Sequence, residues 1–366
     1  MSKRALMAVF VLSVSLVACG GGGGSSGSSP SNVPTPTPSG ATPTSSPTTS
    51  TATPTATPAA ALPSQAIYVS NGNNGSANDN VLVFPVVSSG NATPTSSIGG
   101  SNTNLALSEG IALDASGRIY VANAYPANVD IFAAGSNGNV APVATITNAG
   151  SAFETLGVAV DKAGNIYVTN QGGGTHGNVT VYAAGASGVA TPTETIVGAN
   201  TLLNGPQGIA IGANGNIYVT NGSASGFSGS TVLVFAPGAN GNVAPIATIT
   251  SAGYTATSAT IGIALDASQN IYVTSSGAGG STASVLEFKA GSNGNVTPII
   301  TIAGSNTQMY LNAGLALDTS GNIYVANSGG GELLEYAAGA NGNVAPTATI
   351  FGGSTGLLQP SGIAVH

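Results

Sequence analysis

The chain carries little charge. Lys and Arg number 5, Asp and Glu number 12, and charged residues make up 5% of its 366 residues, against a usual share of roughly 25%. Nucleic-acid binding needs a basic face, so this composition argues against a nucleic-acid partner. Disorder throughout is also excluded, because disordered chains are usually charged and poor in β-branched residues, whereas Val and Ile recur along this chain.

Cysteine and histidine are equally scarce, with one Cys, two His and no Trp. A single cysteine allows no intramolecular disulfide. His176 lies in a Gly-rich segment and His366 is the last residue, so the sequence offers no His/Cys cluster for zinc. It also offers no set of nucleophile, base and orienting residue. We therefore expect no catalytic residues, no bound cofactor or metal, and a binding function rather than an enzyme.

Only one apolar run occurs, and it is N-terminal. Lys3 and Arg4 precede an apolar stretch from Ala5 to Leu16, which is short for a membrane span, since a spanning helix needs about 20 residues. The pattern is typical of a secretory signal peptide, which we place at residues 1–18. Its end, L-V-A-C, resembles the lipobox of bacterial lipoproteins, and the resemblance implies cleavage before Cys19 and lipidation of its thiol. An ordinary signal peptide followed by a free thiol is the alternative.

A lipidated Cys19 predicts an extracytoplasmic protein held to a bacterial membrane, at the outer membrane or the cell surface. Gly20 follows Cys19, and the absence of Asp there is compatible with the outer membrane. Residues 19–64 contain five consecutive glycines and then Ser, Thr and Pro in alternation, a composition that cannot bury a core. We expect a disordered linker there, acting as a tether that is flexible where Gly and Ser dominate and extended where Pro does.

Residues 65–366 consist of one recurring unit. The segment G-I-A-L-D-A-S-G-R-I-Y-V-A-N begins at Gly110, and similar segments follow at spacings of 47, 51, 54, 52 and 48 residues. Their first residues are Gly157, Gly208, Gly262, Gly314 and, for a truncated copy, Gly362. A second half-motif, G-x-N-G-N-V-x-P with an apolar T-I after it, follows the copies. Four-stranded units of about this length are typical of β-propeller blades.

Each unit predicts four short strands, A to D, which are β-branched and aromatic runs bounded by Gly, Asn and Pro. The A–B link D-A-S-G and the C–D link S-N-G-N carry the residues of tight turns. The domain begins at Gln65 with a B strand and ends with an A strand at 362–365. We therefore predict an all-β, six-bladed β-propeller closed by pairing of its N- and C-terminal strands. Closure removes open edges, so we expect a monomer; a capped solenoid of six units is the alternative.

The consensus G-[IVL]-A-[LVI]-D-x-x-G-N-I-Y-V-[AT]-N resembles the NHL repeat. It also resembles the related YVTN repeat, whose letters stand at 167–170 and 218–221. The resemblance covers about 300 residues and implies a propeller fold. It leaves the function open, because such propellers include lyases, lactonases, protein binders and RNA binders.

Two recurring side chains have structural explanations. A tyrosine holds the same B-strand position six times, which suits packing between neighbouring blades better than one ligand. These residues are Tyr68, Tyr120, Tyr167, Tyr218, Tyr272 and Tyr324. An aspartate follows the A strand in four units, where it either closes an Asx turn or binds calcium. These are Asp114, Asp161, Asp266 and Asp318. Gly212 fills the same place in one unit without other change, which favours the turn.

Chain direction alternates along a blade, so the two faces of the disc differ. The A–B and C–D links lie on one face, here the turn face. The B–C loops and D–A links lie on the other, the variable-loop face; they are longer and differ in every unit. Recognition usually lies in such loops on a rigid scaffold. The position-specific residues expected there are Asp79, Glu109, Glu154, His176, Gln207 and Glu332.

These patterns favour a membrane-anchored module that binds a protein or a glycan through the variable-loop face. The alternative is a divalent-metal-dependent hydrolase or lyase, because Ser108-Glu109-Gly110 is similar to the metal-binding Glu-Gly of regucalcin and gluconolactonase propellers. That resemblance implies Glu109 as a metal ligand. However, Ile111 stands where a proline commonly follows, and the Asn and Asp ligands have no identifiable match, so a solvated Glu109 is the simpler interpretation. A purely structural envelope protein is a third possibility.

Overall fold

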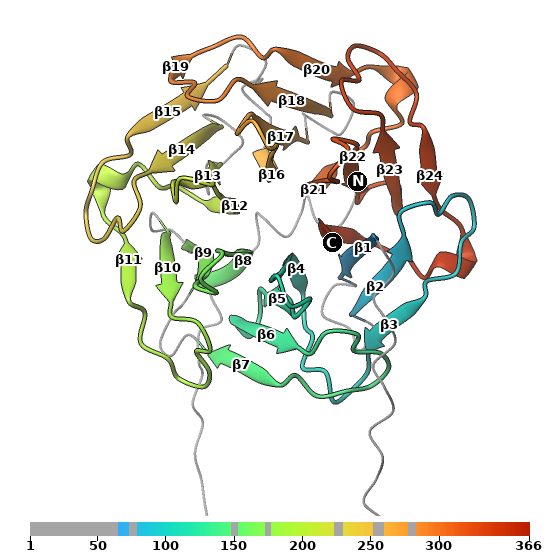
Figure 1. The fold of residues 1–366 in the computed structure, drawn as a ribbon, viewed down its shortest axis with the longest axis horizontal. Helices are drawn as coiled ribbons and strands as arrows, with labels where there is room; N and C mark the ends of the chain where they lie inside the picture. The colour runs from blue at the N-terminus through green and yellow to red at the C-terminus, as the bar shows by residue number, and fades with distance from the viewer. Residues whose placement is uncertain are drawn as a thin grey trace, which may run out of the picture.

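The computed structural model describes residues 65–72, 79–147, 153–172, 177–222, 230–251, 260–276 and 283–366. Six antiparallel sheets surround a central axis (Figure 1), which confirms the predicted six-bladed β-propeller. Within these ranges no helix is long and apolar enough to cross a membrane. The predicted signal peptide, Cys19 and the tether lie outside the described residues.

Each blade runs from an inner strand at the axis to an outer strand at the rim (Figure 1). Blade 1 consists, in this order, of β25 (Pro360–Val365), β1 (Ala66–Asn71), β2 (Asn80–Pro85) and β3 (Ser96–Gly99). Blade 2 consists of β4 (Ser108–Leu113), β5 (Ile119–Asn123), β6 (Asn128–Phe132) and β7 (Ala144–Thr147). Blade 3 consists of β8 (Phe153–Val160), β9 (Ile166–Gly172), β10 (Asn178–Tyr182) and β11 (Glu194–Ile196).

The second half of the ring repeats this order. Blade 4 consists of β12 (Pro206–Ile211), β13 (Ile217–Asn221), β14 (Thr231–Phe235) and β15 (Ala247–Thr250). Blade 5 consists of β16 (Thr260–Leu265), β17 (Ile271–Ser275), β18 (Ser284–Phe288) and β20 (Ile300–Ala303), and its short β19 (Gly294–Asn295) pairs with β15. Blade 6 consists of β21 (Asn312–Leu317), β22 (Ile323–Asn327), β23 (Glu332–Tyr336) and β24 (Ala348–Ile350).

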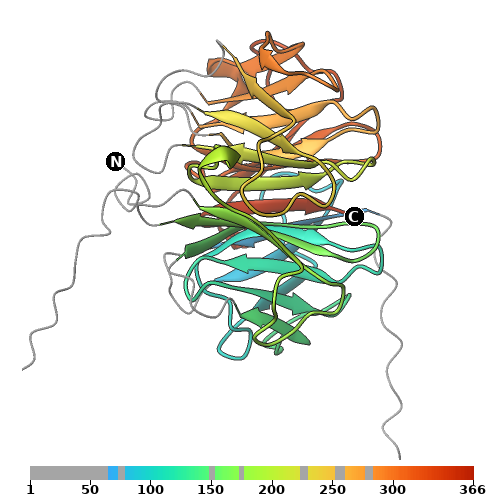
Figure 2. The same cartoon turned by 90° about the vertical axis from the view of Figure 1, so that its left-hand side faces the viewer.

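The ring closes inside blade 1, where the last strand pairs with the first. β25 lies antiparallel to β1, with Val365 opposite Ile67. Beyond the strand ends, the Ala66 N–H donates to the His366 carbonyl at 2.9 Å, and the His366 N–H donates to the Ala66 carbonyl at 3.1 Å. The predicted closure is therefore confirmed. Figure 2 shows the disc from its edge, with the C-terminus at the turn face.

One apolar cluster lies between every two neighbouring blades. The cluster between blades 1 and 2, for example, joins Val81 and Ile98 of blade 1 to Val121 and Phe132 of blade 2. Each of the six clusters contains one tyrosine of the predicted set: Tyr68, Tyr120, Tyr167, Tyr218, Tyr272 or Tyr324. The prediction that these tyrosines pack between blades is confirmed.

The aspartates after the inner strands close turns, as predicted. In blade 3, Asp161 Oδ1 accepts the backbone N–H groups of Ala163 at 2.8 Å and Asn165 at 2.9 Å. Its second oxygen, Oδ2, accepts the Tyr167 hydroxyl at 3.2 Å. The carboxylate therefore fixes the turn and also satisfies the hydroxyl of the tyrosine that packs between blades.

The C–D links differ from the prediction. In blade 2 the link spans residues 133–143 and is no tight hairpin, because it reaches across to blade 1. Gly138 forms a parallel bridge with Ile98, and Asn137 Oδ1 accepts the Ser97 N–H at 3.0 Å. Asn139 Oδ1 accepts the N–H of Asn102, in the D–A link that follows blade 1, at 2.8 Å. The S-N-G-N motif therefore connects neighbouring blades by hydrogen bonds and a parallel bridge. Parallel bridges also join the other neighbouring blades, at Gly90, Gly188, Gly241, Gly294 and Gly342.

The D–A links within the described residues are more alike than predicted. Three contain a 3₁₀ turn, namely η1 (Ala199–Thr201), η3 (Ser305–Thr307) and η4 (Gly353–Thr355). In each, a threonine hydroxyl donates to the carbonyl of a glycine three residues earlier, as Thr201 does to Gly198 at 2.6 Å. Thr103 and Gly100 form the same contact in a fourth link. The four D–A links that the structure describes in full therefore share this contact.

Candidate functional site

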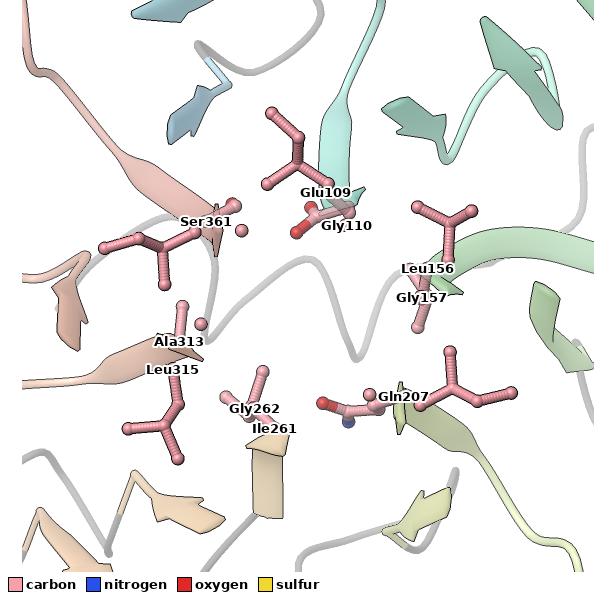
Figure 3. A pocket seen from close by; sticks show the side chains of 17 residues that line it. Glu109, Gly110, Leu156, Gly157, Gln207, Ile261, Gly262, Ala313, Leu315 and Ser361 are labelled. Atoms are coloured by element: carbon pink, nitrogen blue, oxygen red, sulfur yellow. The ribbon is translucent and has the colours of Figure 1, made fainter. Parts of the chain in front are cut away.

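The six inner strands surround a central channel with a cavity of about 110 Å³ (Figure 3). Each blade contributes its strand-A glycine to the lining, and every blade except blade 5 also contributes the residues on both sides of it. Blade 5 contributes Gly262 and the residue before it, Ile261. The glycines are Gly110, Gly157, Gly208, Gly262, Gly314 and Gly362. The channel is thus lined mainly by backbone and by aliphatic side chains.

These glycines allow the inner strands to approach one another closely. A Cβ on Gly110 would lie 2.6 Å from the backbone oxygen of Leu156 in the next blade. A Cβ on Gly262 would lie 2.7 Å from that of Ala313. Real side chains do not tolerate such distances, so the recurring glycine is required by the narrow inner ring rather than by a ligand.

Hydroxyl groups join the inner strands in four blades. Thr220 accepts the Gly208 N–H at 2.7 Å and donates to the Ile261 carbonyl of the next blade at 2.9 Å. The equivalent hydroxyls belong to Ser70, Thr169 and Thr274. Alanine occupies this position in blades 2 and 6, at Ala122 and Ala326. The T in the Y-V-T-N sequence is therefore a link between blades.

The mouth of the channel on the variable-loop face has an uneven chemistry. The six residues that precede the strand-A glycines are Glu109, Leu156, Gln207, Ile261, Ala313 and Ser361. Glu109 and Gln207 are half-buried, and Figure 3 shows their carboxylate and carboxamide directed into the open centre. The structure therefore brings together two of the predicted site residues at the channel.

Glu154 is a third predicted residue, which lies near Glu109 without lining the channel. Its side chain is exposed, and it lies close enough to Glu109 for their charges to interact. Surrounding protein atoms, and to a lesser extent the negative charge of Glu109, raise the pKa of Glu154. Glu109 and Glu154 thus form a pair of carboxylates whose negative charges repel each other.

The other predicted residues lie apart from the channel lining. Asp79 is buried, and its Oδ2 accepts the Ser108 N–H at 3.2 Å, so it fixes the start of β4. Glu332 is half-buried and accepts the side-chain N–H of Asn327 at 2.7 Å; burial raises its pKa. His176 lies outside the described residues.

The mouth does not fit a divalent metal ion. Its ring supplies one carboxylate, one amide and one hydroxyl, and three apolar residues fill the remaining places. Calcium takes six to eight oxygen ligands, and the described residues contain no group of three or more His, Cys, Asp and Glu able to hold a metal. We therefore derive no reaction step through a metal at Glu109.

Comparison with known proteins identifies the fold. No protein-family model and no curated protein sequence matches the chain. Among solved structures, a protein of unknown function from Bacteroides caccae is similar with a TM-score of 0.57 and 12% identity, covering 82% of this chain and 98% of that one. A periplasmic gluconolactonase from Pseudomonas aeruginosa gives 0.53 and 12%, with the same coverages. The PQQ-bound aldose sugar dehydrogenase from Streptomyces coelicolor gives 0.52 and 16%, covering 76% and 88%. The likeness shows a shared propeller fold.

Sequence reasoning missed a buried carboxylate in blade 2. Asp130 is fully buried in β6 and accepts hydrogen bonds from the Asn123 amide at 2.8 Å and the Thr145 hydroxyl at 2.6 Å. Burial outweighs these two hydrogen bonds and raises its pKa to about 6. The signal was present in the sequence, because four other blades have leucine at this register position: Leu82, Leu233, Leu286 and Leu334.

We expect Asp130 to make the stability of the propeller depend on pH. Its pKa is higher in the folded chain, at about 6, than its ordinary value of 3.8, so the folded state binds the proton more tightly. Stability from this group is greatest below pH 3.8 and falls as the pH rises to about 6. Between about pH 4 and pH 7, Asp130→Leu should therefore gain about 3 kcal/mol relative to wild type, measured by urea unfolding. A stability difference that does not change with pH would contradict this expectation.

Proposed function

We propose that the chain is a membrane-anchored extracytoplasmic module that binds a protein or a glycan through its variable-loop face. The observation that carries this proposal is the point at which the chain enters the propeller. Gln65 donates to the hydroxyl of Thr319, at 2.7 Å, in the A–B turn of blade 6. A tether that ends at residue 64 therefore joins the turn face, and the variable-loop face points away from the attachment.

Two exposed tyrosines and an exposed leucine on the variable-loop face support the proposal. Tyr125, in the B–C loop of blade 2, is 76% exposed, and Tyr310 and Leu358, in two D–A links, are 43% and 52% exposed. Exposed tyrosines are enriched at recognition surfaces, because the ring contributes apolar contact area and the hydroxyl a hydrogen bond. We also propose that the repeats are of the NHL/YVTN type, whose propellers include protein binders.

Site-specific photo-crosslinking in cells tests this function. A photo-reactive residue placed at Tyr125 or Tyr310 should crosslink the full chain to one defined partner. The matched control is Val143, which is 63% exposed at the turn-face end of β7 and should give no such product.

The membrane anchor is tested separately. Metabolic labelling with a fatty acid should mark the wild-type chain, and the Cys19→Ser variant should lose both the label and its place in the membrane fraction.

The alternative is a hydrolase or lyase of the gluconolactonase type that uses a divalent metal. Its support is the fold shared with a gluconolactonase and the place of Glu109 at the channel mouth. A melting temperature raised by Ca²⁺, Mg²⁺ or Zn²⁺ in wild type, but not in Glu109→Ala, together with lactone hydrolysis, would favour this alternative. In the crosslinking experiment on the binding proposal, products from Val143 as strong as those from Tyr310 would contradict that proposal.

A further inference from the structure

The variable-loop face carries charge of one sign. Residues 65–366 contain three basic side chains, and all three belong to connections on the turn face: Arg118, Lys162 and Lys289. The segments that form the variable-loop face contain Asp79, Glu109, Glu154 and Glu332, and their sequence has no Lys or Arg. The three basic side chains of residues 65–366 are thus remote from the channel mouth, and a cationic partner is complementary to this face.

The channel mouth adds shape to this charge. The cavity of about 110 Å³ is lined by Leu156, Ile261 and Leu315 as well as by glycine backbone. Pockets for drug-sized ligands usually have volumes of about 300–1,000 Å³, so this cavity suits a narrow group rather than a drug-sized ligand. An unbranched alkyl chain is narrow enough, and its methylenes match an aliphatic wall.

The polar groups of the mouth set the chemistry at the end of that chain. The Glu109 carboxylate accepts hydrogen bonds and carries charge, the Gln207 amide oxygen accepts, and both groups are directed into the centre (Figure 3). An ammonium group has three donors and a compact charge, whereas a guanidinium is a wide planar fork suited to bidentate carboxylates. The narrow ring with one carboxylate suits the ammonium group better.

We propose that the channel mouth binds the side chain of a lysine presented by a partner protein, with its alkyl stem lying across the mouth against Leu156 and Ile261 and its ammonium group at Glu109. This inference rests on the proposed binding function and names the chemistry that the partner presents. Glu154 adds a second negative charge beside Glu109 and attracts the cation toward the mouth.

Titration of the ¹⁵N-labelled full chain with n-butylammonium tests the site, with n-butanol as the uncharged probe of matched shape. We expect butylammonium to shift the amide signals of Gly110, Gly157 and Gly208, and butanol to leave them unchanged. Glu109→Gln should weaken butylammonium binding about tenfold, because a hydrogen bond to a charged group is lost. Higher salt should weaken it further.

The control variant is Glu335→Gln, which removes a carboxylate from the turn-face half of β23 and should leave the titration unchanged. No shift of the channel glycines, or equal binding by Glu109→Gln, would overturn the inference. Glycine shifts produced by Ca²⁺ and not by butylammonium would overturn it in favour of a metal. A partner crosslinked from Tyr310 without any butylammonium binding would leave the proposed function intact and refute only the lysine site.

Discussion

Replacing Gly208 by alanine is expected to destabilise the propeller by about 3 kcal/mol, although it adds a single carbon atom. That carbon would collide with the backbone oxygen of Ile261 in blade 5. The neighbouring atom is main chain, so no side-chain rotation relieves the contact, and two inner strands must move apart. The melting temperature should fall by roughly 5 °C or more.

A glycine in open space provides the matched control for this variant. A Cβ added at Gly353 would have no atom within 4 Å, and the backbone angle there is not left-handed, so Gly353→Ala should melt as wild type does. Equal melting of Gly208→Ala and Gly353→Ala would show that the inner ring can widen at little cost. The glycine at the start of strand A would then need another explanation.

Deleting residues 360–366 should abolish cooperative unfolding altogether. The deletion removes β25, the inner strand of blade 1, and leaves β1 with an unpaired edge along Ile67, Tyr68 and Val69. It also uncovers the apolar cluster between blades 6 and 1, to which Ile363 contributes. An open sheet edge beside exposed apolar side chains favours aggregation, so size-exclusion chromatography should show large species and circular dichroism should show no melting transition.

A synthetic peptide of residues 357–366 should rescue the truncated chain, because the strand carries its own pairing pattern. The same peptide with Gly362→Val should fail, since a side chain there would strike the backbone oxygen of Glu109. A truncated chain that melts cooperatively without the peptide would contradict the view that closure in blade 1 holds the ring together.

The sequence was sufficient for the fold because the repeated features act within one blade. The alternating apolar runs, the Asx turn at Asp161 and the hydrogen bond that Tyr167 donates to Asp161 all involve residues close together in the chain. The two orphan strands at the ends also indicated the closure, since an unpaired β1 and an unpaired β25 complement each other. Such short-range patterns can be counted without knowing any distance between blades.

The features that sequence reasoning missed depend on contacts between blades. Asn139 and the N–H of Asn102 are separated by 37 residues, so their contact exists only once two neighbouring blades are side by side. The S-N-G-N sequence of the C–D link was therefore interpreted as a local turn. The hydrogen bond that Asp79 accepts from Ser108 of the next blade depends on the same packing. Asp130 is different, because its partners Asn123 and Thr145 lie in its own blade. At the candidate site, the sequence placed Glu109 correctly at the start of strand A but gave no information on what surrounds the channel mouth.

The place of β1 between β25 and β2 has a mechanical consequence. β1 is hydrogen-bonded along both edges, and the chain enters it from the turn face. A pull on the tether against a partner held at the opposite face acts along the strand, at right angles to its hydrogen bonds. The hydrogen bonds that join β1 to β2 and to β25 are then loaded together in shear, instead of breaking one after another. The seam that closes the ring is thus also the element through which an anchored propeller would withstand traction, such as that of flowing liquid.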